Sequence, residues 1–180
     1  MNSDERVWRE RGLCAAVVAG DEAAWKTLYD DSFAGLYAYV RWRCGGLRDV
    51  ADEIVQETWL TAVRRVRRFD PARGDFAGWL RGIAANLLRN QFRRGRRDRR
   101  RRRLTDDAAT QPAADRDQAE RVGRALAALP ERYEAVLRAK YLDGRSVTDI
   151  AATTGETPKA VESLLTRARQ AFRDVYGTED

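Results

Sequence analysis

The 180-residue chain carries a net charge of +6, no histidine and two cysteines. It has no histidine for acid-base chemistry, no CxxC metal-ligand spacing and no glycine-rich phosphate loop, so we expect no enzyme, no metal and no cofactor. It also has no basic-then-apolar leader and no apolar run near the ~20 residues of a membrane span, which predicts a cytoplasmic protein.

The excess positive charge lies in one short segment. Residues 1–90 carry 14 basic and 13 acidic side chains, residues 91–104 carry 9 and 1, and residues 105–180 carry 11 and 14. The three segments therefore contribute +1, +8 and −3. This distribution indicates a local contact with a polyanion rather than a uniformly basic surface.

The N-terminal half of the chain is predicted to be helical. One helix begins at Glu22, after the cap residue Asp21, a second spans 49–68, and a third spans 76–92. The predicted core positions are Trp25, Leu28, Tyr29, Leu36, Val40, Ala51, Ile54, Val55, Thr58, Ala62, Val66, Trp79, Leu80, Ile83, Leu87 and Leu88, and Cys14 and Cys44 are interpreted as further buried apolar side chains.

The helix over 49–68 has an acidic face that contains Asp52, Glu53, Gln56 and Glu57. Like charges spaced four residues apart on a helix repel each other by a few tenths of a kcal/mol per pair. One interpretation is a solvated face that the positive N-terminal end of the helix makes tolerable. The other is a docking face for a basic helix, with Gln56 supplying a directional hydrogen bond.

The segment from residue 76 to residue 97 combines aromatic, amide and arginine side chains, as expected where a nucleic-acid strand is stacked and its backbone neutralised. Asn86 and Asn90 lie one helical turn apart and can meet base edges from one face. Trp79 is interpreted as a core residue or as a stacking platform. Residues 93–103, with nine arginines, are either a charged linker or a phosphate contact.

We predict two domains, 1–104 and 118–180, joined by a linker over 105–117, because that stretch is polar, alanine-rich and interrupted by Pro112. Two sequence signals in the second domain predict where helices begin. Ser146 and Asp149 form an S-x-x-D capping box, and Thr157 precedes a proline at the first position of a helix. The fold class is therefore all-α, with two small helical domains joined by a flexible linker.

Residues 147–161 have the spacing of a helix-turn-helix, with Gly155 at the turn and Ile150, Ala151 and Val161 packed inside. An ordinary helical hairpin is the alternative. If the motif holds, its second helix presents to the major groove the side chains of Thr157, Lys159, Ala160, Glu162, Ser163, Thr166 and Arg167. Arg167 and Arg169 are alternatively phosphate contacts.

These motifs carry a family resemblance. The segment 51–60 (ADEIVQETWL) resembles the polymerase-binding helix of region two in the sigma-seventy family, and 69–94 resembles the following segment, which melts and reads the minus-ten element. The segment 125–176 resembles region four. Two regions in this order, without a third domain, are similar to the extracytoplasmic-function sigma factors.

The resemblance implies that Asp52, Glu53, Gln56 and Glu57 bind the basic clamp helices of the largest subunit of RNA polymerase. It implies that the loop from residue 68 to residue 75 receives a base flipped from the melted strand. The residues implied in minus-ten contact are Arg68, Asp70, Arg73, Trp79, Asn86, Asn90, Arg93 and Arg94. Region four is implied in binding the minus-thirty-five element and the polymerase flap.

The resemblance also implies that acidic linker residues, Asp106, Asp107 and Asp115, mimic nucleic acid in the active-site channel. Some positions depart from the family pattern. Ala85 replaces a frequent arginine, Asn90 an aspartate, and Glu162-Ser163-Leu164 a basic-Ser-Arg run. Because a glutamate can accept a hydrogen bond from the cytosine amino group, Glu162 predicts an altered promoter.

We predict a non-catalytic initiation factor that binds core RNA polymerase and promoter DNA. Regulation by an anti-sigma protein is common in the family that it resembles, so such a protein is a candidate partner. A stand-alone helix-turn-helix regulator is the main alternative, but such proteins usually dimerise, and sustained heptads are missing. An RNA-binding or scaffold protein that uses the arginine block is a third hypothesis. It leaves the acidic face with Gln56 unexplained.

Overall fold

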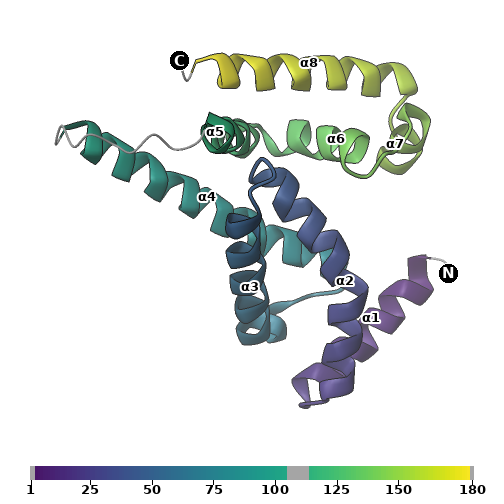
Figure 1. Ribbon diagram of the computed structural model, residues 1–180. Coiled ribbons are helices and arrows are strands. Elements are labelled where there is room, and N and C mark those ends of the chain that lie inside the picture. The colour runs from purple at the N-terminus through teal and green to yellow at the C-terminus, as the bar shows by residue number, and fades with distance from the viewer. Residues whose placement is uncertain (1–2, 105–113, 179–180) are drawn as a thin grey trace. The chain divides into compact units, whose positions relative to one another are not determined.

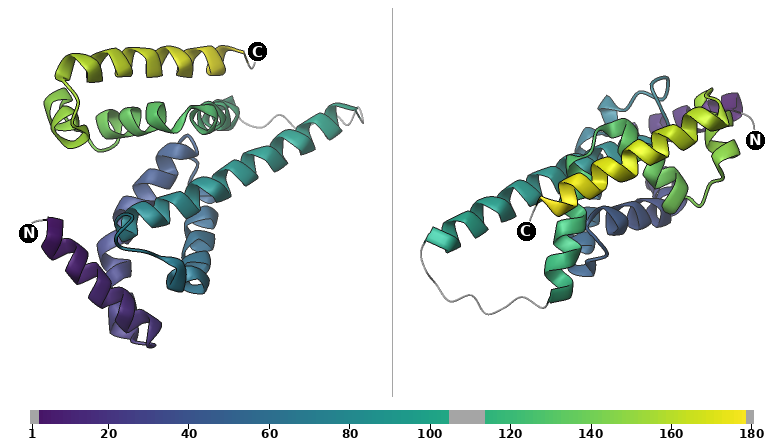
Figure 2. Two further views of the ribbon diagram at one scale, coloured as in Figure 1. Left: turned by 180° about the vertical axis from the view of Figure 1, so that it is seen from behind. Right: turned by 90° about the horizontal axis from the view of Figure 1, so that it is seen from above.

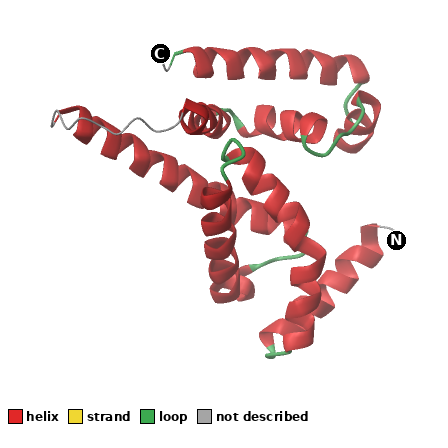
Figure 3. Ribbon diagram, in the orientation of Figure 1, coloured by secondary structure: helices red, strands yellow, loops and turns green. Residues whose placement is uncertain are grey.

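The computed structural model describes residues 3–104 and 114–178, and every regular element in those two ranges is a helix (Figures 1 and 3). The chain divides into two compact units. The first contains Met1–Arg41 and Arg48–Thr105, and the second contains Trp42–Leu47 and Asp106–Asp180. This confirms the predicted all-α class. None of the described helices combines the length and the hydropathy that crossing a bilayer requires.

The helices of the first unit begin and end where the sequence supplies caps and breaks. They are α1 (Ser3–Val18), α2 (Glu22–Arg43), α3 (Arg48–Arg65), the 3₁₀ turn η1 (Val66–Arg68) and α4 (Phe76–Leu104). Asp21 caps α2 as predicted, because its Oδ1 accepts hydrogen bonds from the amides of Ala23 at 2.8 Å and Ala24 at 3.1 Å. Gly45 and Gly46, both at positive φ, follow the end of α2.

The core of the first unit joins α2, α3 and α4, and α3 packs directly against α4. The whole predicted stripe of α3 is buried, as are Leu28, Leu36 and Val40 of α2 and Leu80 and Leu88 of α4. Trp25, Trp79, Ile83 and Leu87 are only partly buried. The core prediction for Tyr29 was wrong, because its side chain is 42% exposed at the edge of a surface groove.

Helix α4 continues well beyond the predicted end at residue 92 and includes the arginine block up to Leu104 (Figure 2). Arginine has a high helix propensity and this block contains no proline, so local preference favours continuation. Most of the predicted linker, including Asp106 and Asp107, lies outside the described residues. Helix α5 begins at Ala114, ahead of the predicted domain start at residue 118.

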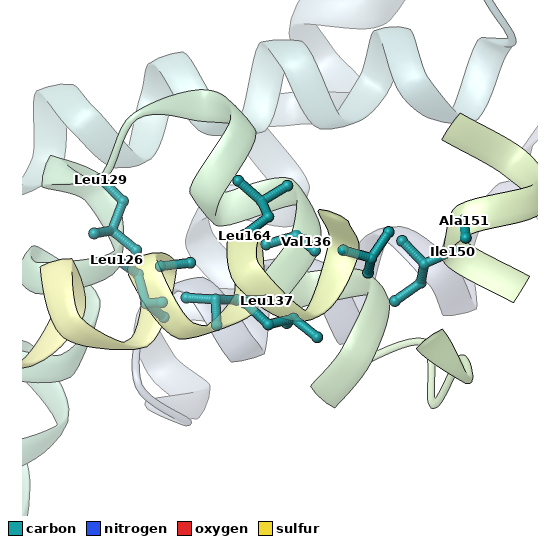
Figure 4. Close-up of a cluster of buried hydrophobic side chains, with 10 residues drawn as sticks. Leu126, Leu129, Val136, Leu137, Ile150, Ala151 and Leu164 are labelled. Atoms are coloured by element: carbon teal, nitrogen blue, oxygen red, sulfur yellow. The ribbon is translucent and has the colours of Figure 1, made fainter. Parts of the chain in front are cut away.

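The second unit consists of α5 (Ala114–Ala128), α6 (Glu131–Tyr141), α7 (Val147–Thr154) and α8 (Pro158–Gly177). Helix α8 runs alongside α6 and crosses α5, and α7 packs against its N-terminal end (Figures 1 and 2). Ten buried side chains form the core (Figure 4): Leu126, Leu129, Val136, Leu137, Ile150, Ala151, Val161, Leu164, Leu165 and Ala168.

The predicted local signals of the second unit are confirmed. The Ser146 hydroxyl accepts from the Asp149 amide at 3.0 Å, and Asp149 Oδ2 accepts from the Ser146 amide at 3.1 Å. Gly155 takes the left-handed conformation at φ 70°, and the Thr157 side chain caps α8 ahead of Pro158. The turn between α7 and α8 is therefore fixed by local chemistry on both sides.

Both cysteines are buried and neither forms a disulfide. Burial raises the pKa of the Cys14 thiol to about 11, with a smaller contribution from Glu10. A thiol with such a pKa stays protonated and unreactive near neutral pH, so the interpretation of Cys14 as a small apolar side chain fits the structure.

Candidate protein and nucleic-acid interfaces

The acidic face of α3 is a surface feature. Asp52, Glu53, Gln56 and Glu57 are all exposed, whereas the opposite stripe of the same helix forms the core. These four side chains make no contribution to the hydrophobic core. They therefore face solvent.

A groove lies beside this face, between α2 and α3, with a volume of about 380 Å³. Its apolar lining extends to Leu60 and Val63, which are 44% and 55% exposed. The residues of this α2–α3 groove are Tyr29, Phe33, Tyr37, Asp52, Val55, Gln56, Trp59, Leu60 and Val63. The groove therefore combines an apolar floor with the acidic and amide groups of Asp52 and Gln56.

Aromatic contacts fix the shape of the groove. The ring of Tyr29 lies 5.0 Å from Phe33 and 4.8 Å from Trp59, measured between ring centroids. Tyr37 hydrogen-bonds to Asp52, and this bond, followed by desolvation, raises the pKa of the Tyr37 hydroxyl. The hydroxyl of Tyr37 on α2 therefore lies beside the Asp52 carboxylate of α3.

Sequence analysis did not assign these aromatic residues to a site. Tyr29, Phe33 and Tyr37 follow one another at intervals of four residues, which places them on one face of α2. That spacing is also typical of a core stripe, and Tyr29 was interpreted in that way. The spacing on α2 alone therefore does not distinguish a groove from a core.

The loop between η1 and α4 leaves its charged residues Arg68, Asp70 and Arg73 exposed. An aromatic cluster underlies its ends. Phe69 lies 5.5 Å from Phe76 and 5.4 Å from Trp79. Because Trp79 is partly buried in this cluster, its contacts favour the core interpretation over a free stacking platform.

Three carboxylates hold the backbone of this loop. Asp70 Oδ1 accepts from the Ala72 amide at 3.0 Å, and Asp75 Oδ1 accepts from the Gly78 amide at 2.7 Å. From α1, Glu10 Oε2 accepts from the amide of Phe76 at 3.1 Å. The loop is thus anchored internally at its start and from two directions at its end.

Beyond the loop, α4 presents Asn86, Asn90, Arg93 and Arg94 to solvent. The Asn86 side-chain oxygen accepts a hydrogen bond from the Arg89 guanidinium. Amide groups and cations therefore follow one another along the exposed surface of a single rigid helix. Such a surface can contact bases through the amides and phosphates through the arginines.

In the second unit, α8 exposes all seven side chains that the helix-turn-helix interpretation assigned to the major groove, including Lys159, Glu162 and Arg167. Leu164 is buried in the core of the second unit. The unusual triplet Glu162-Ser163-Leu164 thus contributes Glu162 and Ser163 to the surface and Leu164 to packing.

Several polar groups of α8 already have partners within the unit. The hydroxyl of Ser163 donates to the Lys159 carbonyl at 2.9 Å, and that of Thr166 donates to the Glu162 carbonyl at 3.0 Å. Arg169 Nε donates to the Tyr141 hydroxyl at 2.8 Å. The long charged side chains of this face, rather than its hydroxyls, therefore have the greatest reach toward a ligand.

Among the residues that the structure describes, no group of three or more histidine, cysteine, aspartate or glutamate side chains is arranged to hold a metal ion.

Comparison with known families gives two matches in one chain. Residues 28–98 match Sigma-70 region 2, and residues 119–172 match Sigma-70, region 4. The chain belongs to the sigma-70 family. The α2–α3 groove, the acidic face and the loop before α4 lie in region 2, and α6, α7 and most of α8 lie in region 4.

Curated relatives place it in the extracytoplasmic-function (ECF) group of that family. It is 32% identical over 175 residues to ECF RNA polymerase sigma factor SigE of Mycolicibacterium smegmatis, a match that covers 91% of this chain and 66% of SigE. It is 31% identical over 164 residues to BldN of Streptomyces coelicolor, covering 83% of this chain and 59% of BldN. The chain therefore spans about two thirds of these relatives or less.

Other comparisons cover more of the matched protein. RpoE of Cereibacter sphaeroides is 27% identical over 162 residues, which cover 85% of this chain and 86% of RpoE. The solved structure of CnrH in complex with the cytosolic domain of CnrY aligns with 96% of this chain and 99% of that chain, at a TM-score of 0.52 and 26% identity. Helix α1 precedes the segment that matches region 2.

Proposed function

We propose that this ECF sigma-70 protein binds core RNA polymerase, directs it to specific promoters and assists DNA melting. The observation that carries the proposal is the presence of both regions in one chain, each with an exposed polar face over a packed core. A stand-alone helix-turn-helix regulator does not need region 2. The proposal places the protein in the cytoplasm and gives it no catalytic residues.

Region 2 is proposed to bind the polymerase through the α2–α3 groove and the acidic face. An amphipathic basic helix fits this surface, since its apolar side chains can enter the groove while its cations meet Asp52, Glu53 and Glu57. The lining of the groove supports this assignment, because the Tyr37 hydroxyl and the Asp52 carboxylate lie beside each other there and offer polar groups next to the apolar floor. Gln56 supplies an additional polar contact.

Region 2 is also proposed to bind the melted minus-ten strand. The loop before α4 would receive an unstacked base, and its exposed charges would contact the neighbouring backbone. The exposed amides and arginines of α4 extend this surface. The proposed contact residues are Arg68, Asp70, Arg73, Asn86, Asn90, Arg93 and Arg94, and Trp79 is proposed to support the loop from the aromatic cluster beneath it.

Region 4 is proposed to read the minus-thirty-five element with α8 in the major groove. Lys159 and Arg167 suit guanine or phosphate, and Glu162 suits the amino group of cytosine. An anti-sigma protein is a further proposed partner, because CnrH, which shares this fold, forms a complex with the cytosolic domain of CnrY.

The test is selection of promoters from DNA duplexes of random sequence. Core bacterial RNA polymerase is mixed with the purified chain, and bound duplexes are sequenced and transcribed. We expect two conserved motifs and transcripts that start at a fixed distance downstream, with neither produced by core polymerase alone. Selection of the same duplexes by the chain without polymerase would instead support a stand-alone regulator.

A further inference from the structure

Helix α1 makes a contact with the proposed minus-ten surface that is distant in sequence. Glu10 Oε2 accepts a hydrogen bond from the backbone amide of Phe76 at 3.1 Å, across 66 positions of the chain. Phe76 is the first residue of α4 and is only 1% exposed. Helix α1 also packs against η1, which ends where the loop begins. One helix therefore contacts both ends of the loop.

The hydrogen bond satisfies a group that the helix itself leaves without a partner. The first amides of any α-helix have no carbonyl acceptor within the helix. Here Asp75 accepts from the Gly78 amide, and Glu10 accepts from the Phe76 amide. Glu10 thus fixes where α4 begins relative to α1.

The position at which α4 begins also determines the shape of the loop. Phe76 packs in the aromatic cluster against Phe69 and Trp79, with ring centroids 5.5 Å away in each case. A displacement of the Phe76 backbone would therefore move the two ends of the loop relative to each other. A flipped base needs a pocket that is formed before the base arrives, because ordering the pocket on binding lowers affinity.

We propose that Glu10 is a positioning residue for promoter melting, acting through its hydrogen bond to the Phe76 amide to keep the loop from residue 69 to residue 75 ready for an unstacked base. This inference rests on the proposed function of the loop. Glu10 contacts no DNA itself in this account. Its acceptor oxygen, rather than its negative charge, is the feature that matters.

The experiment compares Glu10→Ala, Glu10→Gln and a control, Glu22→Ala, which removes an exposed acid at the start of α2. Each full-length variant is assembled with core polymerase on a promoter selected with the wild-type chain. Permanganate reactivity of thymines measures melting, and fluorescence titration without DNA measures affinity for core polymerase.

We expect Glu10→Ala to reduce melted promoter on the order of tenfold, which corresponds to about 1.4 kcal/mol, while affinity for core polymerase is unchanged. Glu10→Gln keeps an acceptor oxygen and should melt the promoter like wild type, as should Glu22→Ala. Rescue by glutamine, together with unchanged polymerase affinity, separates positioning from a general loss of stability.

Three results would overturn the inference. Glu10→Ala melts the promoter as well as wild type, or Glu10→Gln fails as badly as Glu10→Ala, or Glu10→Ala loses polymerase affinity in parallel with melting. Failure of the proposed function has a different signature, because the wild-type chain with core polymerase would then select and melt no promoter.

Discussion

Helices α3 and α8 each bury one stripe of side chains and expose the other, but their exposed faces differ in charge and in what lies beside them. The face of α3 carries Asp52, Glu53 and Glu57 and borders an aromatic groove. The N-terminal part of the exposed face of α8 carries Lys159 and Arg167, with the acid Glu162 among short polar side chains. Similar helical scaffolds can thus be directed toward a protein partner or toward DNA by their exposed residues.

The two faces also differ in which helix supplies the partners of their exposed polar groups. In region 2 a side chain of the neighbouring helix contacts a surface carboxylate, as Tyr37 does for Asp52. In region 4 the hydroxyls of Ser163 and Thr166 donate back to carbonyls of α8 itself. Region 2 therefore presents a surface built by two helices, whereas α8 presents a surface that is largely its own. Mutations in the two regions should therefore have different effects on polymerase binding and on DNA recognition.

The largest effect should come from the cores. Leu80→Ala in region 2 and Leu165→Ala in region 4 each remove a fully buried side chain and should cost about 3 kcal/mol of unfolding free energy. Because the two residues lie in separate compact units, Leu80→Ala should mainly weaken polymerase binding, and Leu165→Ala should mainly weaken minus-thirty-five discrimination. Denaturant unfolding measures the loss of stability. Titration with core polymerase and competition between two DNA sequences measure the two binding activities. Equal loss of both activities in both variants would show that the units fold as one.

The groove provides the next test. Leu60→Ser removes an apolar side chain that is 44% exposed at the groove and should weaken polymerase binding roughly tenfold, as expected for an apolar interface contact. Val18→Ser is the matched control, because Val18 is 43% exposed on α1 and does not line the groove. Titration with core polymerase compares them, and a similar loss in both variants would exclude a specific role for the groove.

A smaller effect is expected on α8. Lys159→Ala should lower the preference for the selected minus-thirty-five sequence over a scrambled one about fivefold, or roughly 1 kcal/mol, and Thr166→Ala should lower it less, because the Thr166 hydroxyl donates to the Glu162 carbonyl. Polymerase affinity should not change, and Gln170→Ala, farther along the same helix, serves as a control. Competition binding with the two DNA sequences gives the ratio. An equal loss of affinity for both sequences would make the contacts nonspecific.

The smallest effect concerns the cap of α7. Hydrogen bonds from Ser146 lower the pKa of Asp149 from its ordinary value of 3.8, so folding favours the ionised carboxylate. Its contribution to stability is present above that value and is lost as pH falls through the lowered pKa. Thermal unfolding of Asp149→Ala should give a slightly lower Tm than wild type at pH 7, and the difference should narrow near pH 3. A difference that does not depend on pH would contradict the role of the charge.

Sequence patterns predicted the parts of this molecule that depend on local chemistry. The cap at Asp21, the capping box at Ser146 and the turn at Gly155 each involve residues within a few positions of one another. The buried stripe of α3 follows from helical periodicity. The exposure of Glu162 and Lys159 follows from the same periodicity in α8.

The features that sequence patterns did not predict depend on contacts between helices. The exposure of Tyr29 depends on how closely α3 approaches α2, because an aromatic row at helical spacing suits a core and a groove equally. Glu10 and Phe76 are far apart in the chain, so nothing in the local sequence of either residue predicts their hydrogen bond. The continuation of α4 through the arginine block reflects helix propensity, which the charge pattern alone did not indicate.

The central claim is that region 2 binds core RNA polymerase through the exposed face of α3. The direct test is a fluorescence titration of the purified chain with core bacterial RNA polymerase in the absence of DNA, repeated with Gln56→Ala and Glu57→Ala combined. The account predicts tight, saturable binding by wild type and roughly 30-fold weaker binding by the double variant, about 2 kcal/mol, with unchanged helix content by circular dichroism. Equal binding by both proteins, or no binding by wild type at moderate salt, would contradict it.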